Sequence, residues 1–169
     1  MRILGIDPGI GRCGWGVLDY QSSKFSVLNF GCIETKPNGD TSKRLQILSN
    51  ELKTVIKKYK PEVLSIEELF FNTNAKTAFI VGEARGVILL TGAQSDLPIS
   101  VYTPLQIKTS LTGYGRAEKG QIGKMVQALL KLKSIPKPDD TADALAVAIT
   151  HAFSYNSRRL YDRQSSRHS

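Results

Sequence analysis

The sequence predicts an α/β domain built on one mixed five-stranded sheet with helices on both faces. The first observation is that three β-branched and aromatic segments follow one another with only turn residues between them, which is typical of antiparallel strands. The second is that strand-like and helical segments alternate after residue 40, which favours parallel strands covered on both faces. The third is that no repeat or shift in composition divides the 169 residues. We therefore expect one domain over residues 1–154, followed by a basic, disordered tail over residues 155–169.

The expected elements follow one another at short intervals. The antiparallel strands are "RILGID", "GWGVLDY" and "FSVLNFGCIET", and the later strands are "EVLSIEEL" and "ISVY". An amphipathic helix is expected from Ser42 to Tyr59, where apolar residues recur at helical spacing and Pro61 closes the segment. Further helices are expected from Ala75 to Ala93, after Pro104, through "IGKMVQALLKL" and through "TADALAVAITHAF". The polar loop "GYGRAEKG" and the linker "SIPKPDD" separate the last three helices.

The charge and the cysteine content narrow the function classes. A formal net charge of +8 and a pI near 9.6 favour a polyanionic partner, with nucleic acid as the leading candidate, although a solubilising surface or the basic tail gives the same number. Cys13 and Cys32 lack the spacing of a disulfide framework or a zinc site. No leader segment and no apolar run long enough for a membrane span is evident. We expect a cytoplasmic protein that binds no membrane.

A glycine-rich stretch near the N-terminus matches a nucleotide-binding motif only in its spacing. Gly9, Gly11 and Gly14 fit the pattern G-x-G-x-x-G. That motif works where the loop opens a helix, because the helix N-terminus holds the pyrophosphate. Here a strand follows, so we expect the glycines to allow a tight hairpin. The residue of interest is Asp7, which closes an apolar strand and either caps a turn or binds something.

Acidic residues also occur at two later positions where elements begin or end. Glu67 and Glu68 end a strand whose side chains alternate between faces, so only one of them can share a site with Asp7. Asp140 and Asp143 lie one turn apart on the same face at the start of the last helix. Acids in a first turn are also common as helix caps and dipole partners.

The last helix carries small residues that allow close packing. Four alanines between residues 142 and 148 would let this helix lie against the sheet, so that its carboxylates reach the strand ends. Carboxylates held so close repel one another unless a cation neutralises them. Oxygen ligands without histidine or cysteine select Mg²⁺ or Mn²⁺. Two such ions could hydrolyse a phosphodiester, which agrees with the basic surface.

Four blocks in this order and spacing carry a resemblance to a known family: "ILGIDPGIGRCGWGV", "SIEELFFNTNAKTA", "GEARGVILL" and "DDTADALAVAITH". The sequence resembles the RuvC family of Holliday-junction resolvases from Met1 to about Phe153. The resemblance implies a ribonuclease H-like fold and a homodimer that uses Mg²⁺, or Mn²⁺ as a substitute. It also implies that the catalytic, metal-binding acids are Asp7, Glu67, Asp140 and Asp143, and it favours Glu67 over Glu68.

The resemblance further implies how such a protein acts. Family members cut two strands of like polarity symmetrically at a four-way DNA junction during recombination and repair, and they work with the RuvA and RuvB branch-migration proteins. The matching positions make Phe70 the aromatic inserted at the junction, and Lys108 and Lys119 contacts to the DNA backbone. Without the family, a phenylalanine at position 70 or 71 is more often a packing residue, and exposed lysines need no partner.

Two glycines mark a possible dimer interface. Gly82 and Gly86 lie four residues apart in a helix rich in small residues, which permits the close approach of another backbone. That backbone is either the sheet below or a twin helix across a two-fold axis, and the resemblance favours the dimer.

Three other functions compete with junction cleavage. An ATPase of the actin and sugar-kinase superfamily starts with a similar strand, aspartate and glycine turn, but it needs a second domain for which 169 residues leave no room. A non-catalytic nucleic-acid-binding module of the same fold would have lost the acids, and all four are present. A ribonuclease H-like nuclease with another substrate, such as an RNA–DNA hybrid, is the alternative that the residues exclude least.

Overall fold

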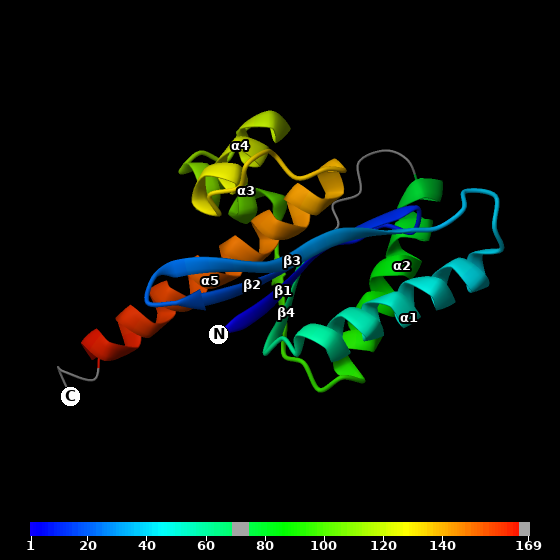
Figure 1. Cartoon of the computed structure of the whole chain (residues 1–169), viewed down its shortest axis with the longest axis horizontal. Coiled ribbons are helices and arrows are strands. Elements are labelled where there is room, and N and C mark those ends of the chain that lie inside the picture. The colour runs from blue at the N-terminus through cyan, green and yellow to red at the C-terminus, as the bar shows by residue number, and fades with distance from the viewer. Residues whose placement is uncertain (69–74, 166–169) are drawn as a thin grey trace.

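A computed structural model describes residues 1–68 and 75–165 of the chain and contains a mixed five-stranded sheet (Figure 1). The strands are β1 (Arg2–Asp7), β2 (Arg12–Gln21), β3 (Lys24–Glu34), β4 (Val63–Glu67) and β5 (Ile99–Tyr102). Their order across the sheet is β3-β2-β1-β4-β5. The first three strands pair antiparallel, and β4 pairs parallel with both β1 and β5. The predicted fold class is confirmed.

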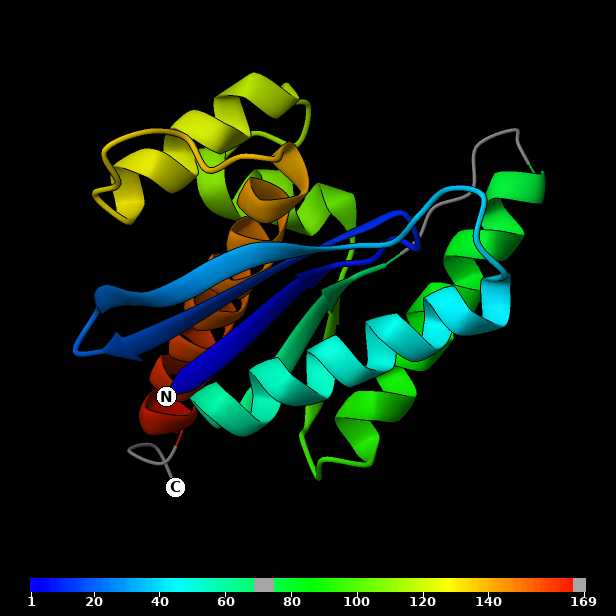
Figure 2. The same ribbon diagram turned by 45° about the vertical axis from the view of Figure 1, so that its right-hand side comes forward.

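The helices cover both faces of this sheet. They are α1 (Thr41–Tyr59), α2 (Ala75–Ala93), α3 (Pro104–Thr112), α4 (Lys119–Leu129) and α5 (Asp139–Ser165). Figure 2 shows the sheet with α5 on one face and with α1 and α2 on the other. One half of the core joins the sheet to α3, α4 and α5, and the other half joins it to α1 and α2. The alternation of side chains along each strand decides which half a residue enters.

Local signals explain where the helices begin and end. The Asp40 side chain accepts a hydrogen bond from the backbone N–H of Lys43 and so caps the start of α1. That helix ends at Lys60, whose left-handed conformation directs its N–H to the carbonyl of Ile56. The start of α3 carries a capping box in which the side chains and backbone of Thr103 and Gln106 bond reciprocally.

Small residues let α5 lie directly on the sheet. A Cβ atom at Gly5 would overlap the carbonyl oxygen of Ala144, and one at Gly14 would overlap the carbonyl oxygen of Asp140. The expected close packing of this helix is therefore confirmed. Gly9 has the expected turn role, because a Cβ there would overlap the carbonyl oxygen of Arg12. Gly14 differs from expectation, since its lack of a side chain makes room for a helix and not for a hairpin turn.

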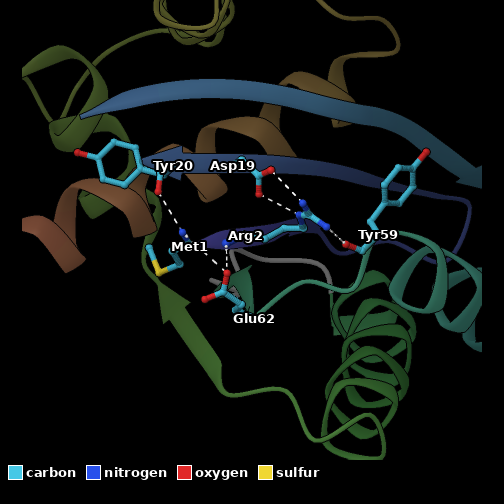
Figure 3. A network of polar contacts seen from close by, with 6 residues as sticks. All are labelled: Met1, Arg2, Asp19, Tyr20, Tyr59 and Glu62. Atoms are coloured by element: carbon cyan, nitrogen blue, oxygen red, sulfur yellow. Dashed lines mark hydrogen bonds and ion pairs between the residues drawn. The ribbon is translucent and has the colours of Figure 1, made fainter. Parts of the chain in front are cut away.

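The beginning of β1 is tied to its surroundings by Arg2 (Figure 3). The guanidinium donates two hydrogen bonds to Asp19 on β2, from Nε to Oδ1 at 2.9 Å and from Nη2 to Oδ2 at 3.0 Å. It also donates to the carbonyl oxygen of Tyr59 at the end of α1. The backbone N–H of Arg2 donates to the Glu62 carboxylate at 2.8 Å. These contacts hold the N-terminal end of β1 in place, and Asp7 lies at the C-terminal end of the same strand.

The C-terminal helix is longer than expected. The sequence predicted a helix that ends near Phe153 and a disordered tail from residue 155, whereas α5 continues to Ser165. Residues 154–165 contain no glycine or proline that would stop a helix. The Ser157 hydroxyl also donates to the carbonyl oxygen of Phe153 within the same helix. The tail is therefore helical over residues 155–165.

Candidate active site

Strand alternation places Asp7 and Glu67 side by side under α5. Ile3 on β1 and Val63 on β4 enter the core half that contains α5. Asp7 lies four residues after Ile3, and Glu67 lies four residues after Val63, so both carboxylates are on that same face. Since β1 and β4 are parallel and Ile3 is paired with Val63, the two acids end neighbouring strands at the same edge of the sheet.

The same alternation decides between the two adjacent glutamates. Glu68 follows the end of β4, has an exposed side chain and donates its backbone N–H to the carbonyl oxygen of Tyr102 at 2.7 Å. It contributes a main-chain contact to the sheet edge. Glu67 is the glutamate that shares a face with Asp7.

The start of α5, from its first turn into its second, adds two more carboxylates. Asp140 and Asp143 are half-buried, with side chains 20% and 25% exposed. The close contact between α5 and Gly14 holds this turn above the strand ends. The neighbouring Asp139 is more exposed and forms an ion pair with Lys137 at 2.9 Å, outside the group. Four acids from three separate segments thus converge as the sequence predicted.

The carboxylates perturb one another. Burial, followed by repulsion from Asp143, Glu67 and Asp140, raises the pKa of Asp7 to about 8. Burial and repulsion from Asp143 raise the pKa of Glu67 to about 7. Burial also raises the pKa of Asp143, against the opposing effect of Lys119. The site disfavours full ionisation of its own acids, which is the property expected of a group that requires an external cation.

Two lysines lie beside this acidic group. The Nζ atom of Lys119, at the start of α4, lies 2.9 Å from Oδ2 of Asp143. Lys108 on α3 and Lys119 both oppose the rise in the pKa of Glu67. These four side chains line one open cleft of about 250 Å³. The structure therefore brings both predicted DNA-contacting lysines next to the predicted catalytic acids.

The donor set fits a hard divalent cation. All four groups are carboxylates, which suit Mg²⁺ or Mn²⁺ better than zinc. Oδ2 of Asp140 is buried and accepts no hydrogen bond within the part of the chain that the structure describes. No three metal-binding side chains of residues 1–68 and 75–165 are already grouped tightly enough to hold an ion. Two of the acids are turned toward protein cations, Asp143 toward Lys119 and Asp140 toward Arg12.

Arg12 is a site residue that the sequence reasoning missed. It opens β2 two residues before Gly14, and its Nε lies 3.2 Å from Oδ2 of Asp140. Its position was implied by the pattern, because Arg12, Gly14 and Gly16 alternate onto the face that meets α5. The signal was hidden because the glycine stretch was judged only as a possible phosphate loop.

The remaining predicted residues lie apart from the acids. Phe70, and Phe71 beside it, fall outside the described residues. Gly82 and Gly86 are on the outer side of α2, where a Cβ atom would meet nothing within 4 Å in the described structure. Ala84 and Ile88 form the buried side of that helix. The two glycines therefore do not make room for the sheet of the same chain. The other predicted role, contact with the same helix of a second copy, stays a prediction.

Comparison with known proteins connects this geometry to one family. The family model for the crossover junction endodeoxyribonuclease RuvC matches residues 3–151. The RuvC protein of Caldicellulosiruptor saccharolyticus is 56% identical over 158 residues, which cover 93% of this chain and 95% of that protein. The RuvC protein of Ruminiclostridium cellulolyticum is 55% identical over 160 residues, 95% of each chain.

Solved structures agree with the sequence relatives. The structure of Thermus thermophilus RuvC superimposes with a TM-score of 0.86 at 34% identity, covering 93% of this chain and 96% of that one. A second structure, of Thermus thermophilus RuvC in complex with Holliday junction substrate, gives a TM-score of 0.85 at 32% identity with the same coverage.

Proposed function

The chain belongs to the RuvC family of crossover junction endodeoxyribonucleases and is a Holliday junction resolvase, and on this premise we propose that Asp7, Glu67, Asp140 and Asp143 are its catalytic residues. The observation that carries the proposal is the convergence of these four half-buried carboxylates, from β1, β4 and α5, beside two lysines. The raised pKa values of Asp7 and Glu67 support a role beyond packing.

The same four carboxylates would hold the metal, which we propose to be two Mg²⁺ ions, with Mn²⁺ as a substitute. When bound, the ions supply an activated water on one side of the phosphodiester and stabilise the leaving oxygen on the other. The protein contributes the arrangement of the ligands, since β1, β4 and α5 are all rigid elements of the core. A bound cation would offset both the burial and the repulsion from neighbouring acids that raise the pKa of Asp7.

Lys108 and Lys119 would hold the DNA at this site. Their ammonium groups line the same cleft as Glu67 and Asp143, so a phosphate that approaches the acids meets positive charge first. The segment 104–138 that carries both lysines contains seven basic residues and one acidic residue. This segment is suited to bind the backbones of the junction arms. Phe70 follows β4 by three residues, and we propose that it stacks on the opened bases at the crossover.

A homodimer would place two such sites on one junction. The outer side of α2 presents Phe79, Gly82, Gly86 and Leu90, at helical spacing. Phe79 is 70% exposed and Leu90 is 57% exposed. Large apolar side chains beside open glycines are typical of a helix that packs against a second copy. Two sites related by a two-fold axis suit the symmetric cleavage of two strands of like polarity.

The cellular setting follows from the substrate. Four-way junctions are intermediates of recombination and repair, and we propose that the protein cuts them in the cytoplasm together with RuvA and RuvB. Among the helices of the described residues, none has the length and apolar character of a membrane span.

One experiment tests the catalytic proposal directly. The protein is incubated with a synthetic four-way junction, a linear duplex and an RNA–DNA hybrid in Mg²⁺, and the cuts are mapped. We expect paired, symmetric cuts in the junction alone. Asp7→Asn should abolish cleavage and leave junction binding nearly intact, since the affinity rests on phosphate contacts. Cleavage by Asp7→Asn at the wild-type rate would remove Asp7 from the catalytic group, and preferred cutting of the hybrid would contradict the junction specificity.

A further inference from the structure

Arg12 contacts Asp140 of the proposed catalytic group, whereas Lys119 contacts Asp143. Its side chain is 57% exposed and extends from the start of β2 to Asp140, with 3.2 Å between Nε and Oδ2. Asp140 is held in place independently of this contact, because its backbone packs against Gly14. Arg12 is therefore not needed to position the helix, and its contact with the carboxylate requires another explanation.

The contact differs from a structural arginine pair in the same chain. Arg2 donates two aligned hydrogen bonds to Asp19, which is the fork geometry that stabilises such pairs. Arg12 approaches a single oxygen of Asp140, and that oxygen accepts no aligned hydrogen bond from the described residues. The pair supplies charge without the directional bonds, so its loss costs little.

Asp140 and Asp143 on α5 are each paired with one protein cation. Lys119 lies 2.9 Å from Asp143, and Arg12 lies 3.2 Å from Asp140, so each acid faces a protein cation. Both acids belong to the proposed metal ligands. A divalent ion bound at Oδ2 of Asp140 would lie beside the positively charged guanidinium, and the repulsion between the two cations favours the departure of Arg12 from this oxygen.

We propose that Arg12 is a displaceable counter-ion that neutralises Asp140 before a divalent cation binds and contacts a DNA phosphate once it is displaced. This inference rests on the proposed metal-binding role of Asp140. The Arg12 side chain is already more than half exposed in its contact with Asp140, and its planar fork is suited to a phosphate group. The exchange couples metal binding to DNA binding. A metal ion at Asp140 frees Arg12 for a DNA phosphate, and a phosphate that binds Arg12 frees Asp140 for the metal ion.

Metal binding in the absence of DNA tests the first part of the proposal, that Arg12 is a counter-ion of Asp140. Mn²⁺ binding is measured by calorimetry for the wild type, Arg12→Ala, Arg12→Lys and Lys137→Ala. Arg12→Ala should bind Mn²⁺ about two- to fivefold more tightly, the range for removal of one partly exposed ion pair. Lys137→Ala is the matched control, since it removes the same charge from a pair with Asp139 beside the site. It should leave the affinity near the wild-type value, and Arg12→Lys should restore the weaker binding.

The salt dependence of junction binding tests the second half. Binding is measured in EDTA and in Ca²⁺, with denaturing gels to establish that the junction stays intact. In EDTA the log–log salt slopes of the wild type and of Arg12→Ala should coincide. In Ca²⁺ the wild-type slope should be steeper by about one, the value for one added phosphate contact.

The outcomes separate this inference from the proposed function. If the wild type binds no Mn²⁺, the proposed metal site fails and the inference fails with it. If the wild type binds Mn²⁺ and Arg12→Ala binds it no more tightly than Lys137→Ala does, only the counter-ion role is overturned. A slope difference of about one in both EDTA and Ca²⁺ would make Arg12 a permanent DNA contact and overturn the displacement.

Discussion

The Nζ atom of Lys119 lies 2.9 Å from Oδ2 of Asp143, which joins the first residue of α4 to the second turn of α5 within the proposed catalytic group. The same ammonium lowers the pKa of Asp7 and of Glu67 against the effect of burial. One exposed cation thus supports the ionised form of three acids.

Lys119→Ala should therefore slow junction cleavage at saturating protein by about a hundredfold, the lower end of the cost of removing one preorganised donor from a developing negative charge. Lys124→Ala removes the same charge from the same helix at a position that does not line the cleft shared by Glu67, Lys108, Lys119 and Asp143. This control should weaken binding at most and leave the saturated rate unchanged. The measurement is a single-turnover cleavage rate. Equal rates for the two variants would show that Lys119 contributes only to affinity.

The repulsion at Asp7 should be measurable as a dependence of stability on pH. In EDTA, the folded state keeps a proton on Asp7 up to about pH 8, whereas the unfolded chain releases it near the ordinary value of 3.8. The folded state is therefore penalised progressively as the pH rises from about 4 to 8, so the melting temperature should fall over this window.

Asp7→Asn should flatten that profile. The variant should melt several degrees above the wild type at pH 8 and close to it at pH 4, since roughly 2–4 °C corresponds to 1 kcal/mol in a domain of this size. Scanning calorimetry across the pH range checks this. Glu67→Gln should have the same effect over a lower window, because the pKa of Glu67 is raised to about 7. A pH profile of Asp7→Asn that is parallel to that of the wild type would contradict the assigned environment of Asp7.

The proposed dimer interface predicts a change in association. Gly86 has open space around it within the described chain, so Gly86→Leu should leave the monomer folded. The added side chain would separate two α2 helices that pack at this point, so the variant should sediment as a monomer at concentrations where the wild type is dimeric. Gly120→Leu adds the same side chain at an equally open helical position on α4. If Gly86→Leu sediments like Gly120→Leu and the wild type, the interface lies elsewhere.

The Arg2 anchor predicts an effect on stability alone. Arg2→Ala removes two hydrogen bonds to Asp19 and one to Tyr59, and the pair is about one-third exposed. We expect a loss of about 1 kcal/mol in the free energy of unfolding at pH 7, with no change in the cleavage rate. Urea denaturation measures the first quantity.

At low pH, the difference in the free energy of unfolding between the wild type and Arg2→Ala should become smaller. The hydrogen bond from Arg2 lowers the pKa of Asp19, so the pair stabilises the fold above the ordinary Asp value and loses that effect as the pH falls through the lowered pKa. The gap between wild type and Arg2→Ala should therefore narrow near pH 2. A gap that stays constant would mean that Arg2 acts through packing and its contact with Tyr59.

Local patterns in the sequence predicted the architecture and the meeting of acids from three segments, whereas the choice of Glu67 over Glu68 came from the family resemblance. Strand alternation places Asp7 and Glu67 on one face, and helical spacing aligns Asp140 with Asp143. The contacts of Arg12 and Lys119 with these acids were harder to predict from the sequence. Lys119 reaches Asp143 because α4 packs near the start of α5, and such packing leaves no period in the sequence. Strand alternation implied the face of Arg12, but not its contact with Asp140. The length of α5 was missed for a different reason, since charged residues after Phe153 suggested disorder although no residue there stops a helix.

The contact between Gly14 and the backbone of Asp140 sets the distance between the sheet and the start of α5 at the proposed active site. The height of the α5 carboxylates above Asp7 and Glu67 is set where two main chains touch, at positions that bear no reactive group. A chain could keep every acid and every lysine and still lose its activity through one added methyl group at Gly14. Among diverged relatives, an inactive protein could therefore be recognised by what fills this gap before any catalytic residue has changed.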